Sequence, residues 1–374
     1  MDRAAVTSQK STLGVSDIEP SSAAPRAAFS FLRSLGAIAV ALAGALVCVY
    51  LKTPLPWLIG PLIAVAAVSM ANGKISEPPL AREAGQWAIG VALGLYFSPD
   101  VVREIARLSP WIAAAVIFSI VLGWLGGWLL SKTVRVDAPT AFFAMAIGGA
   151  PEMAAQAQRN GGQVDKVAAS HALRIMMVVL IVPFAFDAMN VHGLDPYTPL
   201  AKTFSGTGFA VLVAITAGAA AVMERFRSPN SWMIGPLLAA ALITATGHSF
   251  SSFPTAVVNA GQLLIGISLG SHFTPEFFRA APRFLSAVAA ISLLYMLLAA
   301  GFAAMLARGS GLPWPTATIA TTPGGIGEMA LTAQALQLGV PIVTAFHTIR
   351  LLALLLTVGA MYRYWQKWTA RRAG

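Results

Sequence analysis

Long apolar runs, separated by short polar connections, make up most of this chain. The clearest runs cover residues 35–51, 111–131, 168–189, 206–223, 284–306 and 342–361. An α-helix rises about 1.5 Å per residue, so roughly 20 apolar residues cross the ~30 Å hydrocarbon layer of a bilayer. The pattern therefore predicts an all-α polytopic membrane protein. Its expected partner is the lipid bilayer.

The first half of the chain returns in the second half about 176 residues later. The motif W-x-I-G-P occurs at 57–61 and 232–236, G-Q-x-x-I-G-x-x-L-G at 85–94 and 261–270, and G-G-x-x-E-M-A at 148–154 and 324–330. A repeat of this length is too long for a solenoid unit and has the size of half a membrane transporter. We therefore expect a flexible cytoplasmic tail at 1–26, a first membrane repeat at 27–192 and a second at 203–367.

The composition agrees with a membrane protein. Hydrophobic residues make up 57% of the chain and charged residues 11%, whereas soluble domains average roughly 45–50% and about 25%. The formal net charge of +10 would suggest nucleic-acid binding in a soluble protein. Here it matches the excess of Lys and Arg that cytoplasmic loops of membrane proteins carry. We therefore expect no direct nucleic-acid partner.

The fifth apolar segment of each half is short and interrupted by glycine and proline, which leaves two topologies open. If these segments cross the bilayer, the two halves are parallel. If they dip in and return, each half has about five spans plus one broken or re-entrant helix, and the halves are inverted.

The distribution of positive charge separates the two topologies. Among the Lys and Arg of the loops and tails, the inverted arrangement leaves outside only Lys52, Arg103, Arg107, Lys202 and Arg308. It is the better fit to the positive-inside rule, and it makes both termini cytoplasmic. The connections at 73–82, 132–137, 224–230 and 280–282 should then be cytoplasmic, and those at 193–202 and 248–255 external.

The interrupted segments carry the first group of candidate site residues. In the first half, Gly148, Gly149 and Pro151 break the segment, and Glu152 and Gln158 follow the break. Irregular backbone at membrane depth is tolerated only when it is buried in protein or lines a water-filled cavity. Short broken segments at matching positions of two halves are also the best sequence indication of a transporter's binding site.

The second half repeats this arrangement at the matching positions. The corresponding residues are Pro323, Gly324, Gly325, Gly327, Glu328 and Gln334. The simpler alternative is a glycine-rich helix contact with a glutamate placed at a helix N-terminus, where the helix dipole favours it. The recurrence of the glutamate, the glycines and the glutamine favours a binding or coupling site.

A second group consists of His171 with Arg174 and His347 with Arg350, each pair inside an apolar run. A spacing of three places both side chains on one helical face. An arginine in such a run costs at least ~2.5–3.5 kcal/mol, so we expect Glu152 or Glu328 as its partner. The alternatives are a purely structural buried pair and a site in which Arg binds an anion while Glu or His takes up a proton.

The duplicated motifs resemble the AbrB family of Gram-negative inner-membrane proteins over about residues 30–365. Relatives carry two labels, ammonia monooxygenase and regulator of gene expression. Copper oxygenases need clustered histidines, whereas the five histidines here are scattered, so we expect no enzyme, no metal site and no cofactor. Because nothing in the chain resembles a DNA-binding module, any regulation would be indirect.

We therefore predict a secondary transporter or exporter of a small charged solute in the bacterial inner membrane, with its site at the interface of the two repeats. The alternative is a membrane protein that acts indirectly in the regulation of gene expression, as the family label implies. The absence of a P-loop motif argues against ATP-driven transport by this chain. Proton coupling and a homo-oligomer are both compatible with the sequence.

Overall fold

The computed structural model describes residues 23–373, apart from 72, 74 and 194–195. This part of the chain is helical and contains no strand, which confirms the predicted all-α class. The first helix begins at Ala23, within the predicted tail at 1–26. Residues 1–22 of that tail lie outside the described residues.

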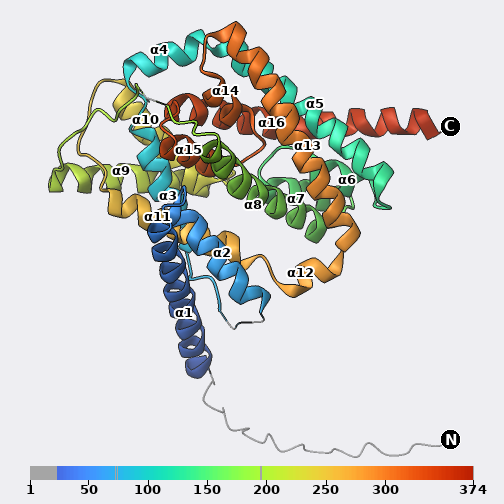
Figure 1. Cartoon of the computed structure of the whole chain (residues 1–374), viewed down its shortest axis with the longest axis horizontal. Helices are drawn as coiled ribbons and strands as arrows, with labels where there is room; N and C mark the ends of the chain where they lie inside the picture. The colour runs from blue at the N-terminus through green and yellow to red at the C-terminus, as the bar shows by residue number, and fades with distance from the viewer. Residues whose placement is uncertain (1–22, 72, 74, 194–195, 374) are drawn as a thin grey trace, which may run out of the picture.

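The helices of the two halves follow one another in the same order (Figure 1). Residues of the first half form α1 (Ala23–Tyr50), α2 (Pro56–Met70), α3 (Ala81–Gly94), α4 (Pro99–Arg107), α5 (Ser109–Thr133), α6 (Ala138–Met145), α7 (Ala150–Arg159) and α8 (Val164–Ala188). Residues of the second half form α9 (Gly206–Arg225), α10 (Ser231–Ala245), α11 (Thr255–Ser271), α12 (Pro275–Ala280), α13 (Pro282–Ser310), α14 (Trp314–Thr321), α15 (Ile326–Ala335) and α16 (Val340–Ala373).

Six of these helices are long and apolar enough to cross a membrane. They are α1, α5, α8, α9, α13 and α16, and each coincides with one of the six apolar runs read from the sequence. Three further apolar helices, α2, α10 and α11, are shorter. The prediction of a membrane protein with long apolar helices is confirmed.

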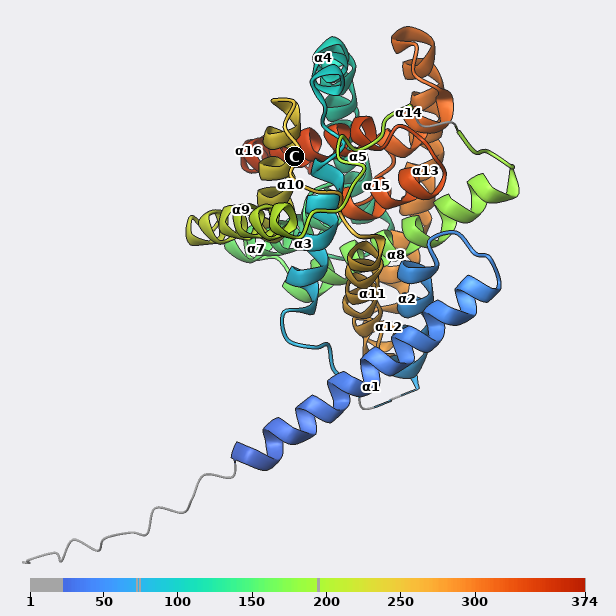
Figure 2. The same ribbon diagram turned by 90° about the vertical axis from the view of Figure 1, so that its left-hand side faces the viewer.

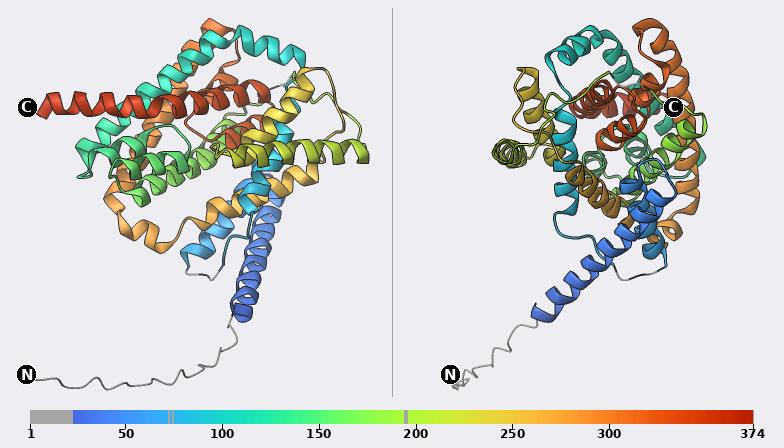
Figure 3. Two further views of the ribbon diagram at one scale, coloured as in Figure 1. Left: turned by 180° about the vertical axis from the view of Figure 1, so that it is seen from behind. Right: turned by 60° about the vertical axis from the view of Figure 1, so that its left-hand side comes forward.

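The helices pack into two bundles, each built from both halves of the chain. The scaffold bundle contains α1, α2, α3, α9, α10 and α11, and the core bundle contains α5 to α8 and α13 to α16. In the scaffold bundle, α3 lies beside α10 and α11 beside α2 (Figure 2). The C-terminal part of α16 projects away from the rest, as the view from behind shows (Figure 3).

Glycines bring the two halves together within the scaffold bundle. A Cβ atom on Gly90 of α3 would lie 2.5 Å from the carbonyl oxygen of Met233 in α10. At the matching position of α11, a Cβ on Gly266 would lie 2.7 Å from the carbonyl oxygen of Leu58 in α2. These glycines therefore serve close helix packing, since only a residue without Cβ allows backbones this near.

The breaks predicted in the fifth segment of each half are present. Helix α6 ends at Met145 and α7 begins at Ala150, while α14 ends at Thr321 and α15 begins at Ile326. Gly149 and Gly325 precede the new helices as N-cap residues with extended backbone. Each half therefore contributes one helix pair that stops and restarts inside the core bundle.

Substitution of Gly90 or Gly266 by alanine should destabilise the protein by about 1–3 kcal/mol, because the added methyl group overpacks the helix contact. Gly218 in α9 and Gly301 in α13 are matched controls, since a Cβ there meets nothing within 4 Å. Those two substitutions should be neutral or slightly stabilising, as alanine is the better helix former. Thermal unfolding in detergent, followed by fluorescence-detected size exclusion, measures the difference. Equal midpoints for the two groups would contradict the packing argument.

Candidate functional site

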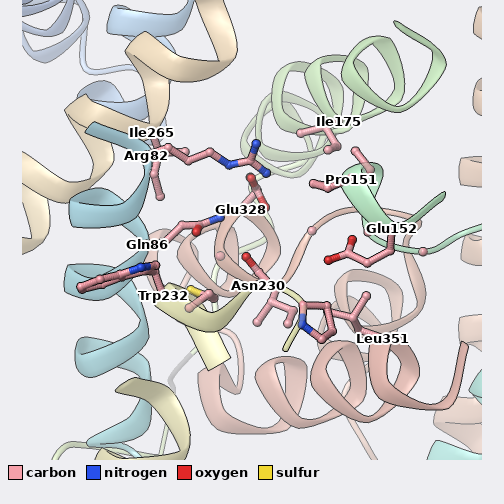
Figure 4. A pocket seen from close by; sticks show the side chains of 18 of the residues that line it. Arg82, Gln86, Pro151, Glu152, Ile175, Asn230, Trp232, Ile265, Glu328 and Leu351 are labelled. Atoms are coloured by element: carbon pink, nitrogen blue, oxygen red, sulfur yellow. The ribbon is translucent and has the colours of Figure 1, made fainter. Parts of the chain in front are cut away.

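A cavity of about 600 Å³ lies between the two bundles, a volume within the range of small-molecule sites. The scaffold bundle lines it with the start of α3, the start of α10 and the end of α11. The core bundle lines it with the two helix breaks and with parts of α8 and α16 (Figure 4). The cavity thus collects backbone and side chains from both halves.

The structure brings most of the sequence-predicted residues to this cavity. The lining residues among them are Gly148, Gly149, Pro151, Glu152, Arg174, Pro323, Gly324, Gly325, Gly327, Glu328, His347 and Arg350. Gln158, His171 and Gln334 do not line it. His171 is buried behind Arg174, and the two glutamines lie near the far ends of α7 and α15. The two glutamines that the sequence grouped with the site therefore lie outside this cavity.

In the first half, a histidine holds the buried arginine. His171 Nε2 lies 2.9 Å from the carbonyl oxygen of Phe143, and Arg174 Nη2 lies 3.0 Å from His171 Nδ1. Arginine can only donate, so Nδ1 accepts and the ring proton sits on Nε2, where it points to the carbonyl. With both nitrogens occupied, the ring is a neutral positioning group for Arg174.

The second half contains the same arrangement. His347 Nε2 lies 2.9 Å from the carbonyl oxygen of Ile319, and Arg350 Nη2 lies 2.8 Å from His347 Nδ1. The same tautomer follows from the same argument. Of the alternatives read from the sequence, the histidines fit the positioning of arginine better than the uptake of a proton.

The expected pairing of these arginines with glutamate is wrong. Arg350 donates from Nη1 to the carbonyl oxygen of Thr322 at 2.9 Å and from Nη2 to that of Gly324 at 2.7 Å. Arg174 donates from Nη2 to the carbonyl oxygen of Ala146 at 3.2 Å. These carbonyls follow α6 and α14, where a helix end leaves acceptors unpaired and carries partial negative charge. The carbonyl end of α6 therefore balances the charge of Arg174, and the carbonyl end of α14 balances that of Arg350.

The two glutamates occupy the opposite ends of the breaks. A Cβ on Gly149 would collide with the carboxyl of Glu152, and one on Gly325 with that of Glu328. Each carboxyl thus folds back over the start of its own helix, where the dipole and free N–H groups favour negative charge. Both residues lie outside the six long apolar helices. Burial raises the pKa of both carboxyls, and the positive charge of Arg82 opposes the rise.

Arg82 is a cavity residue that the sequence interpretation counted only as a loop charge. It stands in the first turn of α3, and its charge acts on both Glu152 and Glu328. Figure 4 shows its side chain extending toward Glu328. The repeat offers no signal for it, because the matching position in α11 is Val258.

The inner wall of the cavity concentrates positive charge. Arg174 and Arg350 are 3% and 5% exposed, and they are near enough for the charge of one to act on the other. Nε and Nη1 of Arg174 are buried without a hydrogen-bond partner in the described structure. Buried donors are rarely left unpaired in native proteins, so this site has spare capacity for an acceptor.

An all-helical chain with long apolar helices and a polar cavity between two bundles is an integral membrane protein. The family model described as "Transition state regulatory protein AbrB" matches residues 57–366, so the chain belongs to the AbrB family. The resemblance read from the duplicated motifs is confirmed.

Two relatives match over nearly their full length. An uncharacterized protein of Bacillus subtilis (strain 168), YhjN, is 25% identical over 365 residues, which cover 89% of this chain and 93% of the relative. A protein of Escherichia coli (strain K12) named as a candidate regulator, AbrB, is 26% identical over 352 residues, which cover 92% of this chain and 96% of the relative.

Replacement of His171 or His347 by phenylalanine should destabilise the protein by about 1–3 kcal/mol, since it leaves a buried carbonyl and a guanidinium N–H without partners. His248 is exposed and its side chain bonds only to Thr246 among the contacts described, so its replacement by phenylalanine is the matched control. Thermal unfolding in detergent compares the three variants. An unfolding midpoint for the two buried variants as high as that of the control would show that the histidines do not hold the arginines.

Proposed function

We propose that this protein is a secondary transporter or exporter of a small anionic solute, which binds in the cavity between the tips of α7 and α15. The observation that carries the proposal is the meeting of Arg174 and Arg350 at one cavity, with unpaired donors on Arg174. Two neighbouring buried cations are costly without an anion between or beside them. The starts of α7 and α15 add two positive helix ends at the same place.

The glutamates give a physical reason for proton coupling. Glu152 and Glu328 occupy the helix starts that an anionic solute would use, so carboxylate and solute compete for the same N–H groups. Protonation removes that competition and one negative charge. Burial raises the pKa of both groups, so protonation increases as pH falls toward the raised pKa, and solute binding strengthens in the same direction.

We further propose that the two halves are inverted in the membrane and that the cavity opens to the cytoplasm. Its lining includes Arg82, Glu83, Glu224 and Arg227, which lie in or directly beside the connections 73–82 and 224–230 that the positive-inside rule assigns to the cytoplasm. The same rule makes both termini cytoplasmic. Location in the inner membrane follows from the family resemblance.

The alternative is a membrane protein that acts in regulation without transport. The family description and the name of the Escherichia coli relative favour it. Such a protein would sense the same anion in the cavity or hold a partner at its loops. An enzymatic role has less support, because the ring nitrogens of His171 and His347 are already engaged by carbonyls and guanidinium groups.

The proposed topology has a direct test in a Cys48→Ser background. Ser228→Cys should react with a membrane-impermeant thiol reagent only from the cytoplasmic side, and Thr198→Cys only from outside. Thr198 is exposed and Ser228 is half-buried, so both positions give a readable signal in inside-out and right-side-out vesicles. Labelling of Ser228→Cys from outside together with Thr198→Cys from the cytoplasm would refute the inverted arrangement.

Solute flux should rise as pH falls, and Glu152→Gln or Glu328→Gln should flatten that dependence, since glutamine mimics the protonated carboxyl at every pH. Electrophysiology on proteoliposomes, with a panel of small carboxylates and phosphates, identifies the solute and records the profile. Glu104→Gln changes an exposed ion pair of α4 instead and should keep the wild-type profile.

Arg350→Gln, compared at equal amounts of folded protein, should weaken solute affinity by roughly 10- to 100-fold. A charge-assisted contact is worth about 1.5–3 kcal/mol, and each ~1.4 kcal/mol is tenfold in affinity. Unchanged pH profiles in both glutamate variants, with unchanged affinity in Arg350→Gln, would remove the cavity from the proposal. A regulatory phenotype that survives these substitutions and fails on loop changes would favour the regulator.

A further inference from the structure

A second pocket, of about 400 Å³, lies between the same two bundles near the opposite ends of several helices. It is lined by the start of α2, the end of α3, the start of α11 and the end of α15. Ser252, Phe253, Pro199 and Ala201 from two connections complete it. By the positive-inside assignment these two connections are external, so this pocket is called the outer pocket and the 600 Å³ cavity the inner cavity.

The two pockets are built from matching positions of the two halves. The start of α2 lines the outer pocket, and the matching start of α10 lines the inner cavity. The start of α3 and the end of α11 line the inner cavity, whereas the end of α3 and the start of α11 line the outer pocket. The matching pairs, with the inner residue first, are Arg82 and Val258, Glu83 and Asn259, Gln86 and Gln262, Asn230 and Leu55, Ser231 and Pro56, Trp232 and Trp57, Ser268 and Ala92, and His272 and Tyr96.

The two pockets differ in the contact that closes them. At the outer pocket, Gln334 Nε2 donates to the hydroxyl oxygen of Tyr96 at 3.3 Å. There α15 packs against α3, and α16 packs against α3 and α4. The end of the core bundle therefore lies against the scaffold bundle on this side.

The matching residues at the inner cavity are apart. Gln158 and His272 are both exposed, and His272 Nδ1 lies 2.6 Å from the carbonyl oxygen of Ser268 in its own helix. Among the described residues, α7 makes little or no contact with α11, and α8 makes little or no contact with α12. These two pairs are the counterparts of α15 with α3 and of α16 with α4. The inner cavity is thus open where the outer pocket is closed.

We propose that the outer pocket is the external access route to the same solute site, with Tyr96 and Gln334 as its closed gate, and that Gln158 and His272 close the inner cavity in the opposite state. The inference rests on the proposed transport function. It requires the core bundle to move against the scaffold bundle, so that α7 packs on α11 as α15 now packs on α3. Exchange of two equivalent packings is the expected route to alternating access in a duplicated transporter.

The charge of the lining residues fits an outer pocket that gives access and an inner cavity that binds the solute. Among the described residues, none that lines the outer pocket is charged, whereas the lining of the inner cavity includes Arg82, Glu83, Glu224 and Arg227. A neutral vestibule does not retain an anion and leaves the arginine-lined cavity as the binding position. A phenol–amide hydrogen bond is a weak closure that a modest change in packing can open.

Crosslinking of paired cysteines tests the gates without knowledge of the solute. In a Cys48→Ser background, Tyr96→Cys with Gln334→Cys and Gln158→Cys with His272→Cys are each treated with a short bifunctional, reducible thiol reagent. Labelling of a third cysteine then reports access, with Trp57→Cys for the outer pocket and Asn230→Cys for the inner cavity. Thr246→Cys with His248→Cys, adjacent in one connection, is the control pair.

The outer-gate crosslink should preserve labelling at Asn230→Cys and suppress labelling at Trp57→Cys. The inner-gate crosslink should do the reverse, with changes of at least about tenfold in labelling rate that reducing agent restores. The control pair should change neither. Failure of Gln158→Cys with His272→Cys to crosslink, or access that is unchanged by either gate crosslink, would overturn the gate assignment.

The two proposals fail in different ways. Reciprocal access without flux of any tested anion would keep the gates and remove the transport function. Flux that continues with both gates crosslinked would keep transport and remove the gates.

Discussion

The structure depends on the side chains that provide partners for the free carbonyl and N–H groups of two interrupted helices. A helix that stops inside an apolar bundle leaves carbonyl groups at one end and N–H groups at the other without partners. Arg350 donates to the carbonyls of Thr322 and Gly324 after α14, and Arg174 to that of Ala146 after α6. Glu152 and Glu328 fold over the starts of the helices that follow. Without these side chains the breaks would be too costly to keep.

This arrangement also keeps the charged groups available for a ligand. If the arginines paired with the glutamates, the four charges would cancel and the cavity would hold no excess charge. Because each group is balanced by a helix end instead, the positive wall and the two carboxyls stay separate within one cavity of about 600 Å³. The histidines contribute by fixing the guanidinium groups from behind. The breaks therefore account for the charged lining on which the proposed anion and proton site rests.

Each bundle contains helices from both halves of the chain, and this shared construction links the two pockets. Gly85 of α3 and Gly261 of α11 meet where these helices cross, since a Cβ on either would lie 2.9 Å or 3.2 Å from the carbonyl oxygen of the other. The scaffold bundle is therefore one unit made from both halves, and the core bundle is another. The proposed movement of these two units would change the inner cavity and the outer pocket together, because both lie along the same contact.

The sequence by itself determined the all-helical membrane class, the six long apolar helices and the broken segments. Each of these follows from local chemistry, namely apolar length, the absence of a Cβ atom and the lack of an N–H group in proline. The sequence also singled out Glu152, Arg174, Glu328 and Arg350 as candidate site residues, because charge inside apolar sequence is rare, and all four line the inner cavity. Only the tertiary structure decided their partners. The acceptors of the arginines are main-chain carbonyls, which every residue carries, so no residue pattern marks them. Arg82 lines the cavity because α3 packs against α15, the helix that follows the break in the second half. Tyr96 contacts Gln334 because the two bundles pack together at the outer pocket.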